Sequence, residues 1–222
     1  MNAEEIATNA KSRIRAKQKE FEKRIDNWGG FSPFDSYSDF KSLTGDYKEK
    51  DGKTITIKDG EIPNQLIGIL NQTRTEFDKY AQEKVEKNFR EKASAANSQL
   101  GLNSLFAGAA GGIGFGGTVV IASSMTGSLF GSTFLGGLFG VALFSNLQAV
   151  LIATGIGIPV AIGLFWGAIE FFKSKTKDSL SEFADKCIDN VDDMKYQAEK
   201  IIKKRNEMIA EAIKNAKTKN WM

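Results

Sequence analysis

The residues that decide the fold run from Lys173 to Lys217 and read KSKTKDSLSEFADKCIDNVDDMKYQAEKIIKKRNEMIAEAIKNAK. Five of their apolar side chains recur every seven positions: Leu180, Cys187, Met194, Ile201 and Met208. Val191 belongs to the alternating apolar positions, and charged residues lie between them. This spacing is typical of a coiled-coil helix, which at 1.5 Å per residue would be about 65 Å long. The stretch therefore predicts a long helical arm that packs against other helices.

Two earlier segments also have helical periodicity. Residues 2–28 carry a seven-residue apolar repeat, and from Ile62 to about Leu100 apolar residues fall at spacings of three and four. Together these arms predict a mainly α fold with long antiparallel helices. The turn dipeptides Asp51-Gly52 and Asp59-Gly60 between the arms indicate a small β-hairpin near residues 50–60. The side chains expected to pack the arms are Ile14, Phe21, Phe77, Phe89, Leu180, Cys187, Val191, Met194, Ile201 and Met208.

The middle of the chain carries no charge. Between Ala93 and Ile169 there is no Asp, Glu, Lys or Arg, although 26% of the protein is charged. About 20 apolar residues suffice for one helical crossing of a bilayer, so the stretch predicts transmembrane helices, with two crossings favoured over three. Many of its glycines lie four apart, which gives a helix face that another helix can approach closely, a glycine zipper. The alternative is a buried hairpin in a soluble helical protein.

The predicted organisation has three parts. Residues 1–100 form an N-terminal helical arm with a small insert, 101–170 a hydrophobic membrane-inserting hairpin, and 171–222 a coiled-coil-like C-terminal arm. The residues expected to insert are Phe106, Gly108, Gly112, Phe115, Gly116, Phe130, Phe134, Gly136, Phe139, Gly140, Phe144, Ile156, Ile158, Gly163, Phe165, Trp166 and Gly167.

Charges at the edges of the uncharged stretch predict its orientation. Lysines and arginines precede it from Lys84 to Lys92 and follow it from Lys173 to Lys177. By the positive-inside tendency, both termini should lie on the same, cytoplasmic side of a membrane. The first residues are polar and acidic, so we expect no signal peptide. The uncharged stretch itself predicts a membrane-associated location.

The sequence offers little catalytic chemistry. There is no histidine, and the single Cys187 lies on an apolar stripe, where a packed thiol is expected. Gly112 to Gly117 matches a dinucleotide-binding glycine pattern, but the next acid is Glu170, far beyond the required spacing. Asp185, Asp189, Asp192 and Asp193 fit a solvated helix face better than a metal site. We expect no enzyme, no cofactor and no metal; the 30 basic and 27 acidic residues are interspersed, so we expect no nucleic acid.

One run of residues carries a resemblance to a known family. Gly155-Ile156-Gly157-Ile158-Pro159-Val160-Ala161-Ile162-Gly163-Leu164-Phe165-Trp166-Gly167 leads into Phe171-Phe172-Lys173-Ser174-Lys175. With the helical arms from Leu66 to Lys217, it resembles the stalk and membrane paddle of bacterial dynamin-like, mitofusin-like proteins. The GTPase domain and its phosphate-binding loop are absent, which implies a subunit whose motor lies on another chain. Helical pore-forming toxins are similar in arrangement.

These features predict a non-enzymatic protein that inserts its hairpin and perturbs or permeabilises a lipid bilayer. A remodelling or anchoring subunit that works with a partner GTPase is the alternative, and a passive anchor with a coiled-coil scaffold is the second alternative. The expected partners are a lipid bilayer and either further copies of the chain or another helical protein.

Overall fold

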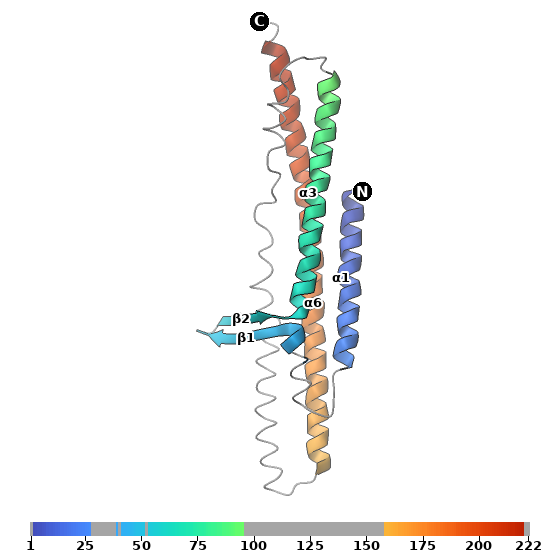
Figure 1. Cartoon of the computed structure of the whole chain (residues 1–222), viewed down its shortest axis with the longest axis vertical. Coiled ribbons are helices and arrows are strands. Elements are labelled where there is room, and N and C mark those ends of the chain that lie inside the picture. The colour runs from blue at the N-terminus through green and yellow to red at the C-terminus, as the bar shows by residue number, and fades with distance from the viewer. Residues whose placement is uncertain (1, 28–38, 40, 52, 96–157, 220–222) are drawn as a thin grey trace. The chain divides into compact units, whose positions relative to one another are not determined.

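The computed structural model describes residues 2–27, 39, 41–51, 53–95 and 158–219. The described chain is mainly α-helical (Figure 1). Its long helices are α1 (Ala3–Asp26), α3 (Glu61–Ala95) and α6 (Ile158–Lys219), and its strands are β1 (Gly45–Lys50) and β2 (Lys53–Asp59).

A reciprocal pair of hydrogen bonds begins α1. The Asn2 side chain accepts a hydrogen bond from the Glu5 backbone N–H at 2.8 Å, and the Glu5 carboxylate accepts one from the Asn2 backbone N–H at 2.8 Å. This capping box satisfies two backbone donors that a helix start would otherwise leave without partners. Helix α3 begins at Glu61 and has Pro63 in its first turn. Proline is tolerated there because backbone N–H groups in the first turn have no acceptor within the helix.

Helix α6 is one element of 62 residues. Its only proline is Pro159, in the first turn, and no glycine follows Gly167. With no residue to break the backbone ladder, the helix continues from the uncharged stretch into the charged arm. The predicted boundary between residues 170 and 171 therefore lies inside α6.

Strands β1 and β2 pair antiparallel, with an irregularity between Asp46 and Tyr47. Between the strands, Asp51 has a φ of 53°, a left-handed conformation that aspartate tolerates better than most residues. Gly60 follows β2 and lies so close to residues 43–45 that an added Cβ would overlap their backbone atoms. The path from β2 into α3 therefore depends on a residue without a side chain.

The chain forms two compact units. Unit 1 contains Met1–Ser12, Leu70–Thr118 and Ile188–Met222, and unit 2 contains Arg13–Ile69 and Val119–Cys187. The described buried apolar residues of unit 1 are Ala3, Ile6, Ala7, Ala10, Leu70, Phe77, Ala81, Val85, Phe89, Val191, Met194, Ala198 and Ile209. Those of unit 2 are Ile14, Phe21, Ile25, Leu43, Ile62, Leu66, Ile69, Leu180, Phe183, Ala184 and Cys187.

Ion pairs define the direction of α1 against α6. In unit 1, Glu4 pairs with Lys195 and Lys11 with Asp192, so numbers that rise along α1 fall along α6. These two helices are antiparallel. In the same unit α3 and α6 run in the same direction (Figure 1). The arms before and after the uncharged stretch are thus not the antiparallel pair that the sequence predicted, because only a short connection forces neighbouring helices to be antiparallel.

No helix in the described ranges is long and apolar enough to cross a bilayer. The uncharged part of α6 ends at Glu170, so it spans the twelve residues 158–169. At 1.5 Å per residue this covers about 18 Å of a hydrocarbon core that is about 30 Å thick. This finding overturns the prediction of transmembrane helices, and with it the pore-forming activity and the membrane-associated location that depend on them.

The predicted inserting residues from Phe106 to Ile156 lie outside the described residues. The remaining five, Ile158, Gly163, Phe165, Trp166 and Gly167, lie in the first turns of α6. Of these, Gly167 is exposed, and a Cβ added there would meet no atom within 4 Å.

Candidate functional site

In unit 1, one stripe of α6 faces α1. Asp192 accepts a hydrogen bond from Lys11 at 2.7 Å, and Lys195 pairs with Glu4, which raises the pKa of Lys195. The stripe continues at spacings of three and four through Glu199, Lys203, Asn206 and Ala210, which places these residues on the same side of the helix. Helix α1 begins at Ala3, so its contacts with this stripe end near Lys195.

Beyond that point, an open groove of about 530 Å³ lies between α3 and α6. Its lining residues come from α3 (Tyr80 and Lys92) and from α6 (Glu199, Ile202, Lys203, Asn206, Glu207 and Ala210). The α6 residues span three helical turns, or about 16 Å. The groove therefore occupies the position next to α3 and α6 that α1 fills earlier along α6.

An apolar cluster lies beside this groove. Val85 and Phe89 of α3 and Ile209 of α6 are buried together, and the half-buried Ile202 and Ile213 pack against them. The cluster brings α3 near Phe89 level with α6 near Ile209. Among the described residues, this cluster is a contact between two helices, α3 and α6.

Polar groups of both signs line the groove. Glu199 and Glu207 are acidic, Lys92 and Lys203 are basic, and no net charge results. The Asn206 side-chain oxygen is buried but accepts no hydrogen bond from any described residue. A buried acceptor without a donor costs about 1–3 kcal/mol.

Met208 shows how the buried face of α6 shifts toward its C-terminus. Leu180 and Cys187 are fully buried, whereas Met208 is 48% exposed, although all three belong to the seven-residue repeat. Its neighbour Ile209 is buried instead. A straight helix has 3.6 residues per turn, so a strict seven-residue repeat drifts by about 20° per heptad. The prediction that Met208 packs the arm is wrong for this reason.

The other predicted packing residues lie as follows. Ile14, Phe21, Phe77, Phe89, Leu180, Cys187, Val191 and Met194 are buried, and Ile201 is half-buried. Burial raises the pKa of the Cys187 thiol to about 12, so the reactive thiolate is scarce at neutral pH.

In unit 2, two lysines of α6 hold the C-terminal end of α1. Lys173 is buried and donates hydrogen bonds to the Asp26 backbone carbonyl at 3.0 Å and to Glu170 at 3.1 Å. Lys177 pairs with the Asp26 carboxylate. Cations at a helix C-terminus satisfy its last carbonyls and its dipole. Two of the three basic residues that suggested a membrane exit thus bind the end of α1.

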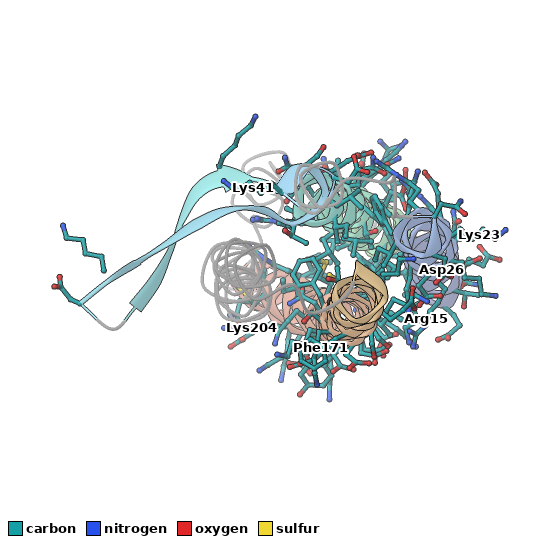
Figure 2. The ribbon with its side chains drawn as sticks, turned by 90° about the horizontal axis from the view of Figure 1, so that it is seen from below. Arg15, Lys23, Asp26, Lys41, Phe171 and Lys204 are labelled. Carbon is teal, nitrogen blue, oxygen red and sulfur yellow. The ribbon has the colours of Figure 1, made fainter. Side chains whose placement is uncertain are left out.

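Further ion pairs of unit 2 join α1 to α6 and to α3. Arg15 donates to Asp185 at 2.7 Å, and in Figure 2 Arg15 lies on the α6 side of α1 while Lys23 points away. Arg24 donates two hydrogen bonds of 2.8 Å to the Glu61 carboxylate. The bidentate contact lowers the pKa of Glu61 and raises that of Arg24.

Acidic residues of α6 take part in helix contacts. Asp185 and Asp192 each pair with a basic residue of α1. In the part of the chain that the structure describes, no three His, Cys, Asp or Glu side chains are grouped to hold a metal ion. Asp185 and Asp192 thus stabilise the pairing of α1 with α6.

The groove residues Tyr80, Glu199, Lys203 and Asn206 are not among the residues predicted from the sequence. Their signal is the stripe at spacings of three and four that begins at Asp192. This stripe is polar, so apolar periodicity does not reveal it. Asn206 differs from its surroundings only in being a buried amide, which the sequence does not show.

Comparison of the chain with known protein families, with curated proteins and with solved structures finds no match.

Proposed function

We propose that this protein is a non-enzymatic helical stalk that works by binding a further helix in the groove between α3 and α6. The single observation that carries the proposal is the stripe of α6 from Asp192 to Ala210. One part of that stripe binds a helix of the chain itself, and the rest lines an open groove. A surface that binds one amphipathic helix has the shape and spacing to bind another.

The groove composition supports a protein partner. Tyr80 and the apolar cluster at Val85, Phe89 and Ile209 supply apolar area, and charges of both signs surround it. An apolar centre with a charged rim is typical of helix–helix interfaces.

A photo-crosslinking amino acid tests the proposal. Placed at Lys203, inside the groove, it should couple to the bound helix in cells that express the full chain. Placed at Lys204, it should not, because the next residue of a helix points about 100° away. Lys203 and Lys204 are both exposed lysines, so the two variants are matched. Equal products at both positions, or none at either, would contradict the proposal.

The resemblance to dynamin-like stalks implies one alternative partner, a chain that carries a GTPase domain. Mass spectrometry of the Lys203 product distinguishes it, since a GTPase peptide joined at this position would favour that alternative. Most of the uncharged stretch lies outside the described residues, so perturbation of a bilayer by it stays a prediction from the sequence. Dye release from liposomes is its test.

A further inference from the structure

The groove is the uncovered end of a helix pair, and α1 does not extend into it. The capping box at Asn2 and Glu5 begins α1 next to Lys195, so the helix backbone does not continue past that level. No other described helix of the chain lies in the groove.

We propose that a second copy of this chain covers the groove, so that two α3–α6 pairs pack about a two-fold axis into a four-helix bundle. This inference rests on the proposed function and names its partner. A two-fold interface brings the same patch of each copy against itself, so the patch must be self-complementary in charge and shape.

The charges of α6 meet this condition. We place the two-fold axis at the level of Arg205, so that the two α6 helices are antiparallel. A residue that precedes Arg205 then lies opposite the residue that follows Arg205 by the same number of positions in the second copy. Lys203 then lies level with Glu207 of the second copy, and Glu207 with Lys203 of the second copy. Both pairs join opposite charges across the interface.

The charges of α3 meet the same condition. Phe89 clusters with Ile209, and the two helices run in the same direction, so Lys92 lies near the level of Ala212. Glu199 precedes Arg205 by six residues, so in the second copy it lies about 9 Å past the axis, toward Ala212 of the first copy. It is therefore nearly level with Lys92. One axis position thus pairs all four charged side chains of each groove.

The same axis brings the two copies of Asn206 together. Each Asn206 lies one residue from the level of Arg205, so the two amides differ by about 3 Å along the bundle. The two Asn206 residues then lie close together across the interface.

Charge exchange in the full chain tests the inference by sedimentation velocity. The double variant K92E/K203E has four acids in each groove, and E199K/E207K has four bases. We expect the wild-type chain to be a dimer and each variant alone to dissociate about 100-fold more readily, since like charges would face each other. An equimolar mixture should restore the dimer, because every pair again joins Glu to Lys.

The matched control is K200E/K204E, which changes the same net charge on exposed residues of the same helix outside the groove. It should leave the dimer unchanged. A wild-type monomer, a mixture that does not recover, or equal assembly of all variants overturns the inference. If the wild-type chain is monomeric while the Lys203 crosslink joins another protein, this inference fails and the proposed function stands.

A disulfide test does not depend on charge. Asn206→Cys should form a disulfide dimer on mild oxidation, whereas Lys204→Cys should not, because residue 204 lies about 160° around the helix from residue 206. Native Cys187 is buried with a raised thiol pKa and should not contribute. Absence of the dimer at position 206, or equal yields at both positions, contradicts the two-fold arrangement.

Discussion

Two stretches of α6 have the same seven-residue repeat and different surroundings. Leu180, Cys187 and Met194 are at most 4% exposed, whereas Met208 is 48% exposed. Near Asp185 and Asp192, α6 is held by ion pairs from α1, and among the described residues Lys195 is the last residue along α6 to make one. The comparison shows that a seven-residue repeat does not keep its side chains on one face along a straight helix, so burial passes from the repeat position Met208 to its neighbour Ile209.

The largest expected effect separates the two stretches directly. Leu180→Ala removes a fully buried side chain and should lower the free energy of unfolding by about 3 kcal/mol. Met208→Ala, at the equivalent heptad position, should change it by less than about 0.5 kcal/mol, because the side chain is already exposed. Urea unfolding followed by circular dichroism measures both. Equal losses would show that Met208 is covered as Leu180 is.

A second pair of variants compares a covered glycine with an open one. Gly60→Ala places a Cβ against the backbone of residues 43–45 and should destabilise the chain by about 2 kcal/mol. Gly68→Ala, on an exposed face of α3 with no atom within 4 Å, should stabilise it by about 0.5–1 kcal/mol. Thermal unfolding distinguishes the signs, and a neutral Gly60→Ala would mean that residues 43–45 can move away.

The third prediction concerns the point where cover by α1 begins. Asn2→Ala removes one half of the capping box and should cost about 1 kcal/mol. Amide hydrogen exchange should rise in the first turn of α1 and near Lys195. Thr8→Ala, at an exposed position within the helix, is the control and should change stability by less than about 0.5 kcal/mol. Unchanged exchange in Asn2→Ala would show that the box does not hold the helix start.

The smallest expected effect depends on pH. Arg24 lowers the pKa of Glu61 below its ordinary value of 4.5, so the folded chain favours the ionised carboxylate. The stabilisation is therefore present above the ordinary pKa and lost as pH falls through the lowered pKa. Because both side chains are partly exposed, it should be about 0.5 kcal/mol. The stability difference between wild type and Glu61→Gln should shrink as the pH falls below about 4.5 in urea titrations, and a constant difference would contradict the pairing.

Local sequence patterns predicted most helix positions well. The long helix from Lys173 follows from its apolar repeat, and the start of α3 follows from Pro63. They did not predict that α6 extends back to Ile158, because a change from uncharged to charged residues reads as a boundary although nothing in it breaks a helix. The sequence patterns also predicted that the basic residues after the uncharged stretch lie at a membrane surface. In the structure, Lys173 and Lys177 bind the C-terminal end of α1.

The groove could not be predicted in the same way. Glu199, Lys203 and Asn206 are ordinary surface residues of a charged helix when read in order. Their meaning depends on α3 at one side and on the end of α1 at the other, both distant in the sequence. The orphan oxygen of Asn206 is likewise a property of its surroundings.

By itself, the sequence determined that this protein is built from long amphipathic helices, because periodic apolar side chains and a lack of helix breakers act within a few turns of backbone. The tertiary structure alone decided the directions of α1 and α3 against α6, the burial of Ile209 in place of Met208, and the open groove beyond Lys195. These depend on which helix lies beside which, and the free energy of burial belongs to the pair of surfaces in contact.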